Sequence, residues 1–161
     1  VIHNEKDVEE LLVKPWLRTL GWVLDRSNCQ VWIELDRDKA EMWNYSSRRM
    51  CRDYVLGTAS GFEMHIEAKH RWAGWKLDLP AVLERFSRED YADSEKAGPI
   101  KDLALLLWGV RSRGGRRAAV VDESQLAIFE WTSHWTIPAR AIVTDDSFPE
   151  VAARWLSPRL N

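Results

Sequence analysis

The sequence predicts an α/β domain in which a mixed β-sheet is flanked by helices. Its 161 residues are enough for one domain with a substantial core and too few for two, so we expect a single domain over 1–161. Stretches with the periodicity of amphipathic helices alternate along the chain with short β-rich runs. The resulting order of a helix, three strands, helices, further strands and a last helix is typical of this fold class.

The N-terminal stretch from about Asn4 to Leu20 is expected to be an amphipathic helix, with Asn4 as N-cap and Gly21 as C-cap. Pro15 lies inside it. Because proline removes one backbone hydrogen bond and crowds the preceding turn, we expect it to kink or split this helix. The apolar residues that recur at helical spacing are Val8, Leu12, Val13, Trp16, Leu17 and Leu20.

Three strands are predicted next. The run from Gln30 to Leu35 alternates apolar and polar residues. Two further β-rich runs, Arg52 to Gly57 and Phe62 to Lys69, flank a turn that is rich in glycine, serine and threonine. We therefore expect these two runs to form an antiparallel hairpin.

The second half of the chain is expected to contain three more helices and three more strands. One helix begins at Leu79 with Pro80 at its first position, and another runs from Pro99 to about Arg111 before two glycines. The remaining predicted elements are strands at Ala118–Val121, Leu126–Trp131 and Arg140–Val143, and a terminal helix at Phe148–Leu156.

Composition restricts the partners and the compartment. A formal net charge of −2 provides no general basic field, so a nucleic-acid partner must be attracted by local patches or by other chains. Two cysteines, Cys29 and Cys51, are too few to staple a secreted fold, which favours the cytoplasm.

The longest apolar run, Leu103 to Val110, is far shorter than the ~20 residues of a membrane span, so we expect no membrane partner. The chain begins at Val1, which is consistent with its being part of a longer protein.

The hairpin carries the residues with the clearest chemistry. Asp53 lies on its first strand, and Glu67 and Lys69 lie on its second, where alternation places them on one face with Glu63 and His65. Two carboxylates and an ammonium at one spot are the minimum needed to hydrolyse a phosphodiester with a metal-activated water. We expect this polar face to lie outside the core. The alternative is an exposed strand face with cross-strand salt bridges.

The first predicted helix provides a further candidate, Glu9, which lies on its apolar stripe. A carboxylate that faces the core needs a partner, which a metal or Lys69 would provide. The alternative is that Glu5 and Glu9 only complement the positive end of the helix dipole.

Four segments together resemble the N-terminal nuclease domain of type I restriction enzyme R subunits, which belongs to the PD-(D/E)xK nuclease superfamily. They are Asn4–Glu9, Pro15–Trp22, Asp53–Leu56 and Ile66–Lys69, and the resemblance covers about residues 4–131. It implies a restriction-endonuclease-like fold. Each motif is short, and the specificity comes from their order and from two matched spacings.

The resemblance also implies the roles of the candidate residues. Asp53 and Glu67 would bind Mg²⁺ (or Mn²⁺), Lys69 would orient or activate the attacking water, and Glu9 would complete the site. In one departure, Arg52 stands where the superfamily has its proline.

A second departure concerns the helix after the core motif. Members of the family often carry a glutamine and, one turn later, a tyrosine on this helix, and neither is present between Pro99 and Arg111. Lys101 or Trp108 would be the substitutes. Without this pair, the resemblance does not imply that this helix contacts DNA or assists catalysis.

Two groups of residues are candidates for contacts with nucleic acid. Flexible glycines let arginines approach a phosphate backbone, and tryptophans stack on bases. The alternatives are a solvated turn for the arginines and core packing for the tryptophans. The candidates are Arg111, Arg113, Arg116, Arg117, Trp72 and Trp75.

The function expected from these observations is that of a metal-dependent endonuclease domain that hydrolyses DNA phosphodiester bonds in a restriction or phage-defence system. Its partners would be DNA and other subunits or a motor domain of a restriction complex, because the chain has no Gly-Lys-Ser/Thr phosphate loop. One alternative is a catalytically inactive nuclease-like module that binds nucleic acid or a protein. A third is an interaction domain built around exposed tryptophans.

Overall fold

The computed structural model describes residues 1–22, 32–33, 54–57, 63–86, 98–112 and 114–157. These residues form a mixed α/β structure around a six-stranded sheet whose strands lie in the order in which they occur in the chain. The strands are β1 (Trp32–Ile33), β2 (Tyr54–Gly57), β3 (Glu63–Ala68), β4 (Arg117–Val121), β5 (Gln125–Trp131) and β6 (Trp135–Ile142).

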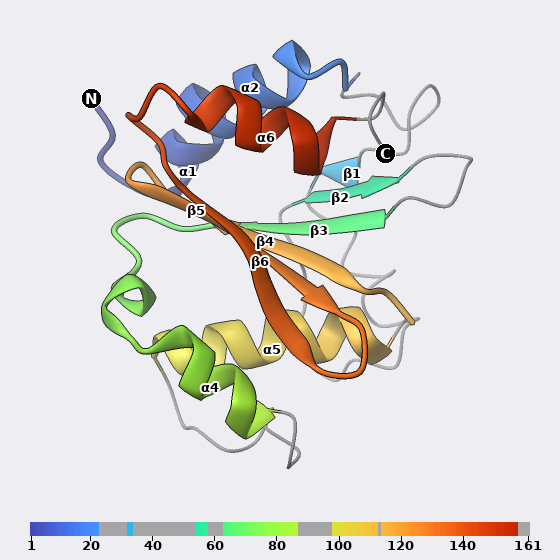
Figure 1. Ribbon diagram of the computed structural model, residues 1–161. Helices are drawn as coiled ribbons and strands as arrows, with labels where there is room; N and C mark the ends of the chain where they lie inside the picture. Colours follow the sequence, from blue (N-terminus) through green and yellow to red (C-terminus); the bar gives the residue numbers. More distant parts are fainter. Residues whose placement is uncertain (23–31, 34–53, 58–62, 87–97, 113, 158–161) are drawn as a thin grey trace.

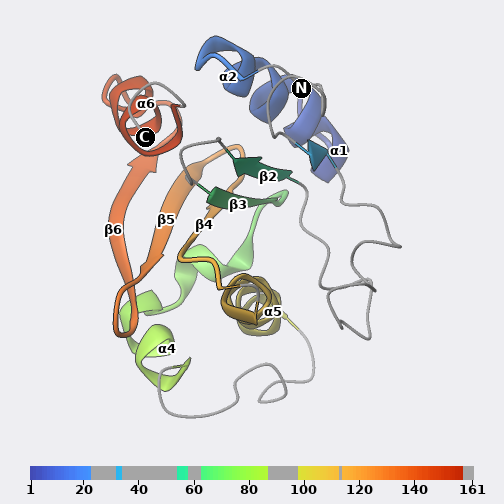
Figure 2. The same cartoon turned by 90° about the vertical axis from the view of Figure 1, so that its right-hand side faces the viewer.

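The helices form a layer on each face of this sheet (Figures 1 and 2). The first, second and last helices cover one face, and α4 and α5 cover the other. No helix in the described ranges has the length and apolar character needed to cross a membrane. The helical elements are α1 (Glu5–Val8), the π-helical turn η1 (Glu9–Val13), α2 (Lys14–Thr19), the 3₁₀ turn η3 (Ala73–Lys76), α4 (Leu79–Phe86), α5 (Pro99–Ser112) and α6 (Phe148–Leu156).

The sheet is mixed because β3 and β4 are parallel, whereas the other neighbouring strands are antiparallel. The predicted hairpin is confirmed: β2 pairs with β3, with Tyr54 opposite Ile66 and Leu56 opposite Met64. Parallel neighbours need a long crossover connection, and here the segment between β3 and β4 contains η3, α4 and α5. The carboxyl ends of β3 and β4 therefore lie at the same edge of the sheet.

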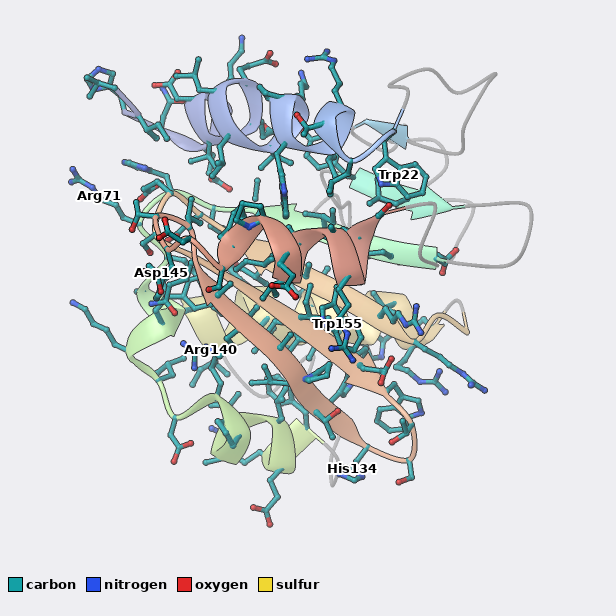
Figure 3. All side chains as sticks on the ribbon, turned by 45° about the horizontal axis from the view of Figure 1, so that its top comes forward. Trp22, Arg71, His134, Arg140, Asp145 and Trp155 are labelled. Carbon is teal, nitrogen blue, oxygen red and sulfur yellow. The ribbon has the colours of Figure 1, made fainter. Side chains whose placement is uncertain are left out.

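The N-terminal helix contains the irregularity expected from Pro15. Its middle part, η1, widens into a π-helix in which the amide of Lys14 donates to the carbonyl of Glu9. Proline cannot donate a backbone hydrogen bond and its ring crowds the preceding turn, so a wider turn immediately before it relieves the conflict. Trp22 follows this helix, and its indole Nε1 donates to the carbonyl of Leu156 at 2.7 Å, which ties α6 to this layer (Figure 3).

Each face of the sheet has its own apolar core. Met64 and Ile66 of β3 pack with the layer of α1, α2 and α6, whereas Ala118 and Val120 of β4 pack with α4 and α5. The expectation that the polar face of β3 lies outside the core is wrong at His65, which is aligned with Ala118 and fully buried. The helices on this second face cover a position that alternation alone assigns to solvent.

The last strand is longer than predicted. β6 begins at Trp135 rather than at Arg140, and it includes Pro138, a residue that argues against a strand in sequence analysis. Because β6 is at the edge of the sheet, it has one side without ladder hydrogen bonds, and proline is tolerated there.

Candidate functional site

The ammonium group of Lys69, the residue after β3, lies close to carboxylates from three separate elements. Its Nζ is 3.7 Å from Oε1 of Glu67 on β3, 3.8 Å from Oε1 of Glu5 in α1, and 3.6 Å from Oδ2 of Asp102 in α5. We call these four residues the Lys69 cluster. Two carboxylates from helices therefore lie beside the ammonium of the predicted pair of Glu67 and Lys69.

Local structure explains how the four side chains meet. Glu67 and Lys69 are two positions apart at the end of a strand, so they point to the same side. Glu5 lies in the first turn of α1, where the side chain of Asn4 caps the helix by accepting from the amide of Asp7 at 2.9 Å. Asp102 lies in the first turn of α5. Both first turns lie near the carboxyl end of β3, on opposite faces of the sheet (Figure 1), and helix N-termini favour carboxylates.

The Lys69 cluster is partly open to solvent and carries an excess of negative charge. The side chains of Lys69 and Glu67 are each 20% exposed, and those of Glu5 and Asp102 are 53% and 45% exposed. One ammonium against three carboxylates leaves two formal negative charges. All three N···O distances exceed the length of a normal hydrogen bond, so these three ion pairs are loose. Such an arrangement attracts cations and can rearrange around a ligand.

Of the other two predicted catalytic residues, Glu9 and Asp53, the structure describes only Glu9. Glu9 accepts a hydrogen bond at 3.1 Å from the hydroxyl of Tyr54, a buried residue of β2. The carboxylate of α1 that approaches Lys69 is that of Glu5, one turn earlier. Asp53 lies outside the described residues.

Beside the Lys69 cluster, the turn between β4 and β5 contains a buried carboxylate with many hydrogen bonds. Asp122 accepts from the amide of Trp72 at 2.8 Å and from the indole Nε1 of Trp75 at 2.7 Å. It also accepts from the amide and the hydroxyl of Ser124, both at 2.7 Å, and from the amide of Gln125 at 3.0 Å. Asp122 is fully buried, so its charge depends on these donors.

The pKa of Asp122 reflects this balance. Burial is the largest single influence and raises the pKa of the carboxyl group. The hydrogen bonds from Ser124, Trp75 and Trp72 act in the other direction and together bring the pKa below its ordinary value. Asp122 is therefore an ionised structural centre.

The next residue, Glu123, holds the chain that follows Lys69. Its carboxylate accepts from the amide of Arg71 at 2.7 Å and lies 3.1 Å from Nδ1 of His70. Arg71 has a φ of +46°, which non-glycine residues adopt rarely. The backbone amide of Lys69 donates to the carbonyl of Val121 at 2.9 Å. The turn after β4 therefore fixes the backbone on both sides of Lys69.

The predicted nucleic-acid contacts are supported unequally. Nη1 of Arg111 donates to the carbonyl of Gly115 at 2.9 Å, and the guanidinium lies over the ring of Trp131, 4.7 Å from its centroid. Arg117 pairs with Glu130 at 3.1 Å. These partners reduce the charge available for phosphate. Arg116 is exposed, and Arg113 lies outside the described residues.

The two candidate tryptophans also differ. Trp72 is only 6% exposed, so the placement of its ring in the core leaves little surface on which a base could stack. Trp75 is half-buried and meets Trp72 edge to face, with the ring centroids 4.7 Å apart. The guanidinium of Arg140 lies 5.7 Å from the ring centroid of Trp75, and Arg140 projects from β6 beside α4 (Figure 3). Trp75 is the better of the two candidates.

Sequence reasoning missed Glu5 as a partner of Lys69, as well as Asp102 and Asp122. On the helix after the core motif, the residue that reaches Lys69 is Asp102, rather than one of the substitutes considered there, Lys101 and Trp108, which carry no negative charge to pair with an ammonium. The sequence signal for Asp102 is its place in the first turn of a predicted helix. Acidic residues are common there because they interact favourably with the positive end of the helix dipole.

The described residues include no group of three or more histidine, cysteine, aspartate or glutamate side chains arranged to hold a metal ion. Comparisons with known proteins add no relationship: no protein-family model, curated protein or solved structure matches this chain.

Proposed function

We propose that this chain is a metal-dependent endonuclease domain of the PD-(D/E)xK type, with a restriction-endonuclease-like fold, that hydrolyses DNA phosphodiester bonds. The observation that carries the proposal is the Lys69 cluster, in which the ammonium of Lys69 lies 3.7 Å from the carboxylate of Glu67 at the end of β3. The pair lies at the end of the strand that follows Asp53 and the β2–β3 connection in the sequence. A phage-defence or restriction system is the proposed setting.

The donor chemistry fits a hard divalent cation. Carboxylate oxygens are the ligands that Mg²⁺ and Mn²⁺ prefer, and the two formal negative charges of the Lys69 cluster favour a cation beside it. Glu67 and Asp53 are the residues proposed to hold the ion. When bound, the ion would supply a water of lowered pKa and neutralise charge on the phosphate.

The residues of the chain would provide positioning and electrostatic stabilisation. Lys69 presents a positive charge beside Glu67, where it would stabilise negative charge that develops on the phosphate oxygens. Asp122 and Glu123 hold the backbone around Lys69, so the ammonium is presented from a rigid support. A backbone fixed in this way lowers the cost of ordering the ammonium during the reaction.

DNA contacts are proposed for the exposed Arg116 and for Arg111, Arg113 and Arg117 around the connection from α5 to β4, with Trp75 as a candidate for stacking. Because the net charge is −2, these local contacts alone would give weak binding. Other subunits or a motor domain of a restriction complex are therefore the proposed source of additional affinity.

The experiment is a cleavage assay on supercoiled plasmid and linear DNA, with the purified protein in Mg²⁺, in Mn²⁺ and in EDTA. We expect nicking or cutting with either metal and none in EDTA. DNA binding without cleavage in both metals would instead favour the inactive nuclease-like module. The observation that favours this alternative is that the helix from Pro99 to Arg111 lacks the glutamine and the tyrosine that the family often carries there.

A further inference from the structure

Three carboxylates reach Lys69 from both faces of the sheet. Glu5 approaches from α1 on one face, and Asp102 approaches from α5 on the other. Glu67 lies between them on the same strand end as Lys69. The contact with Asp102 is the shortest of the three, at 3.6 Å.

A single ion pair does not fix a lysine side chain in one position. Lysine is a point charge on a flexible stem with several rotatable bonds, and an exposed pair gives little energy to offset the loss of that freedom. Partners on opposite sides restrict the ammonium more than either would alone. Among the described residues, Asp102 holds the ammonium from the side of α5 and Glu5 holds it from the side of α1, so the loss of Asp102 should shift the ammonium toward α1.

We infer that Asp102 is a positioning residue for Lys69, and that α5 acts on the candidate site through this carboxylate. The family often carries a glutamine and a tyrosine on the helix after the core motif. In this chain the same helix contributes the carboxylate of Asp102. The consequence for cleavage rests on the proposed function. Once Glu67 is engaged by a cation, Asp102 and Glu5 remain as counter-ions that keep Lys69 at the end of β3.

The test measures how strongly Asp102 restrains the amine of Lys69, without relying on DNA cleavage. The purified protein is treated with a trace of an amine-acetylating reagent, and mass spectrometry gives the acetylation rate of Lys69 relative to that of the exposed Lys76 in the same molecule. We expect Asp102→Asn to raise this ratio roughly threefold, the factor that corresponds to the loss of one exposed ion pair. Asp102→Glu keeps the carboxylate and should restore the slow rate.

The control is Asp146→Asn, which removes an equal charge from an exposed aspartate between β6 and α6 and should leave the ratio unchanged. Circular dichroism confirms that each variant is folded. An equal Lys69 ratio in the unmutated protein and in Asp102→Asn would overturn the inference, as would an equal rise in Asp146→Asn.

Cleavage assays on the same variants separate this inference from the proposed function. If the protein cuts DNA, Asp102→Asn should lower the turnover rate roughly tenfold, a modest loss for a group that acts through another residue, and Asp102→Glu should recover it. If no variant cuts DNA but the acetylation ratio still responds to Asp102, the positioning role stands and the nuclease proposal fails. Unchanged turnover in Asp102→Asn would show that the position of Lys69 does not depend on Asp102 during the reaction.

Discussion

Two carboxylate centres lie at the same edge of the sheet, after the parallel strands β3 and β4, and they are built in opposite ways. Asp122, after β4, is fully buried and accepts hydrogen bonds of 2.7–3.0 Å from backbone and side-chain donors. The carboxylates around Lys69, after β3, are 20–53% exposed and pair with its ammonium at 3.6–3.8 Å.

The difference indicates a division of roles. A buried carboxylate with all these donors stabilises one conformation and has little capacity for a ligand. Loose ion pairs at the surface contribute little to stability, but they can exchange partners when a cation or a phosphate arrives. We therefore expect changes at Asp122 to affect folding and changes in the Lys69 cluster to affect activity.

The largest expected effect is on cleavage. Lys69→Ala should lower the rate by at least ~10²-fold, as expected when a group that stabilises the transition state is removed. The melting temperature should change little, because the pairs of Lys69 are partly exposed. Lys76→Ala is the matched control and should keep its activity. Unaltered cleavage by Lys69→Ala would assign the activity to other residues or to a contaminant.

Stability should respond in the opposite way at Asp122. Asp122→Ala leaves the buried amide of Trp72 and the less buried donors of Trp75 and Ser124 without their acceptor, which should lower the free energy of unfolding by at least about 2 kcal/mol. Urea denaturation of this variant and of Lys69→Ala measures the contrast. A loss in Asp122→Ala no greater than that in Lys69→Ala would remove the distinction between the two centres.

The pH dependence of stability should identify the same carboxyl group. Hydrogen bonds bring the pKa of Asp122 in the folded protein below its unfolded value. Its contribution to stability is therefore fully present above the unfolded pKa of about 4, and it is lost as the pH falls through the lower folded pKa. Urea denaturation between neutral and acidic pH should show a weaker acid dependence in Asp122→Asn. An identical dependence in both proteins would contradict this assignment.

The smallest expected effect concerns Glu9. Tyr54→Phe removes the hydroxyl that donates to Glu9 at 3.1 Å, and it should lower the free energy of unfolding by about 1 kcal/mol. Because Glu5 of α1 pairs with Lys69, whereas Glu9 of η1 accepts from Tyr54, cleavage should stay within roughly threefold of the unmutated rate, the factor of one weak pair. A tenfold loss of cleavage with unchanged stability would show that Glu9 acts in the reaction.

Elements with a strong local signal are predictable from the sequence. The pattern predicts the last helix over Phe148–Leu156, the bounds that it has, because an early proline and an apolar stripe both favour a helix there. The hairpin of β2 and β3 is predictable because two β-rich runs flank a turn that is rich in glycine, serine and threonine. The start of β6 is not, because tolerance of Pro138 depends on the strand being at an edge, which is a property of the assembled sheet.

The candidate site is predictable only where its residues are neighbours in the chain. Glu67 and Lys69 meet because strand alternation places them on one side. Asp102 meets Lys69 only because the crossover between β3 and β4 places the start of α5 at the carboxyl end of β3. The burial of His65 likewise depends on helices that cover the sheet from far along the chain.

The central claim is that Glu67 helps to hold a divalent cation beside Lys69. The most direct measurement is the melting temperature of the unmutated protein and of Glu67→Gln across a range of Mg²⁺ and Mn²⁺ concentrations. We predict that the unmutated protein melts higher as the logarithm of metal concentration rises above the dissociation constant. Glu67→Gln should lose most of this response and melt no lower in EDTA, because one of the repelling carboxylates has gone. If the melting temperature of the unmutated protein does not rise with either metal up to millimolar concentrations, the claim is contradicted.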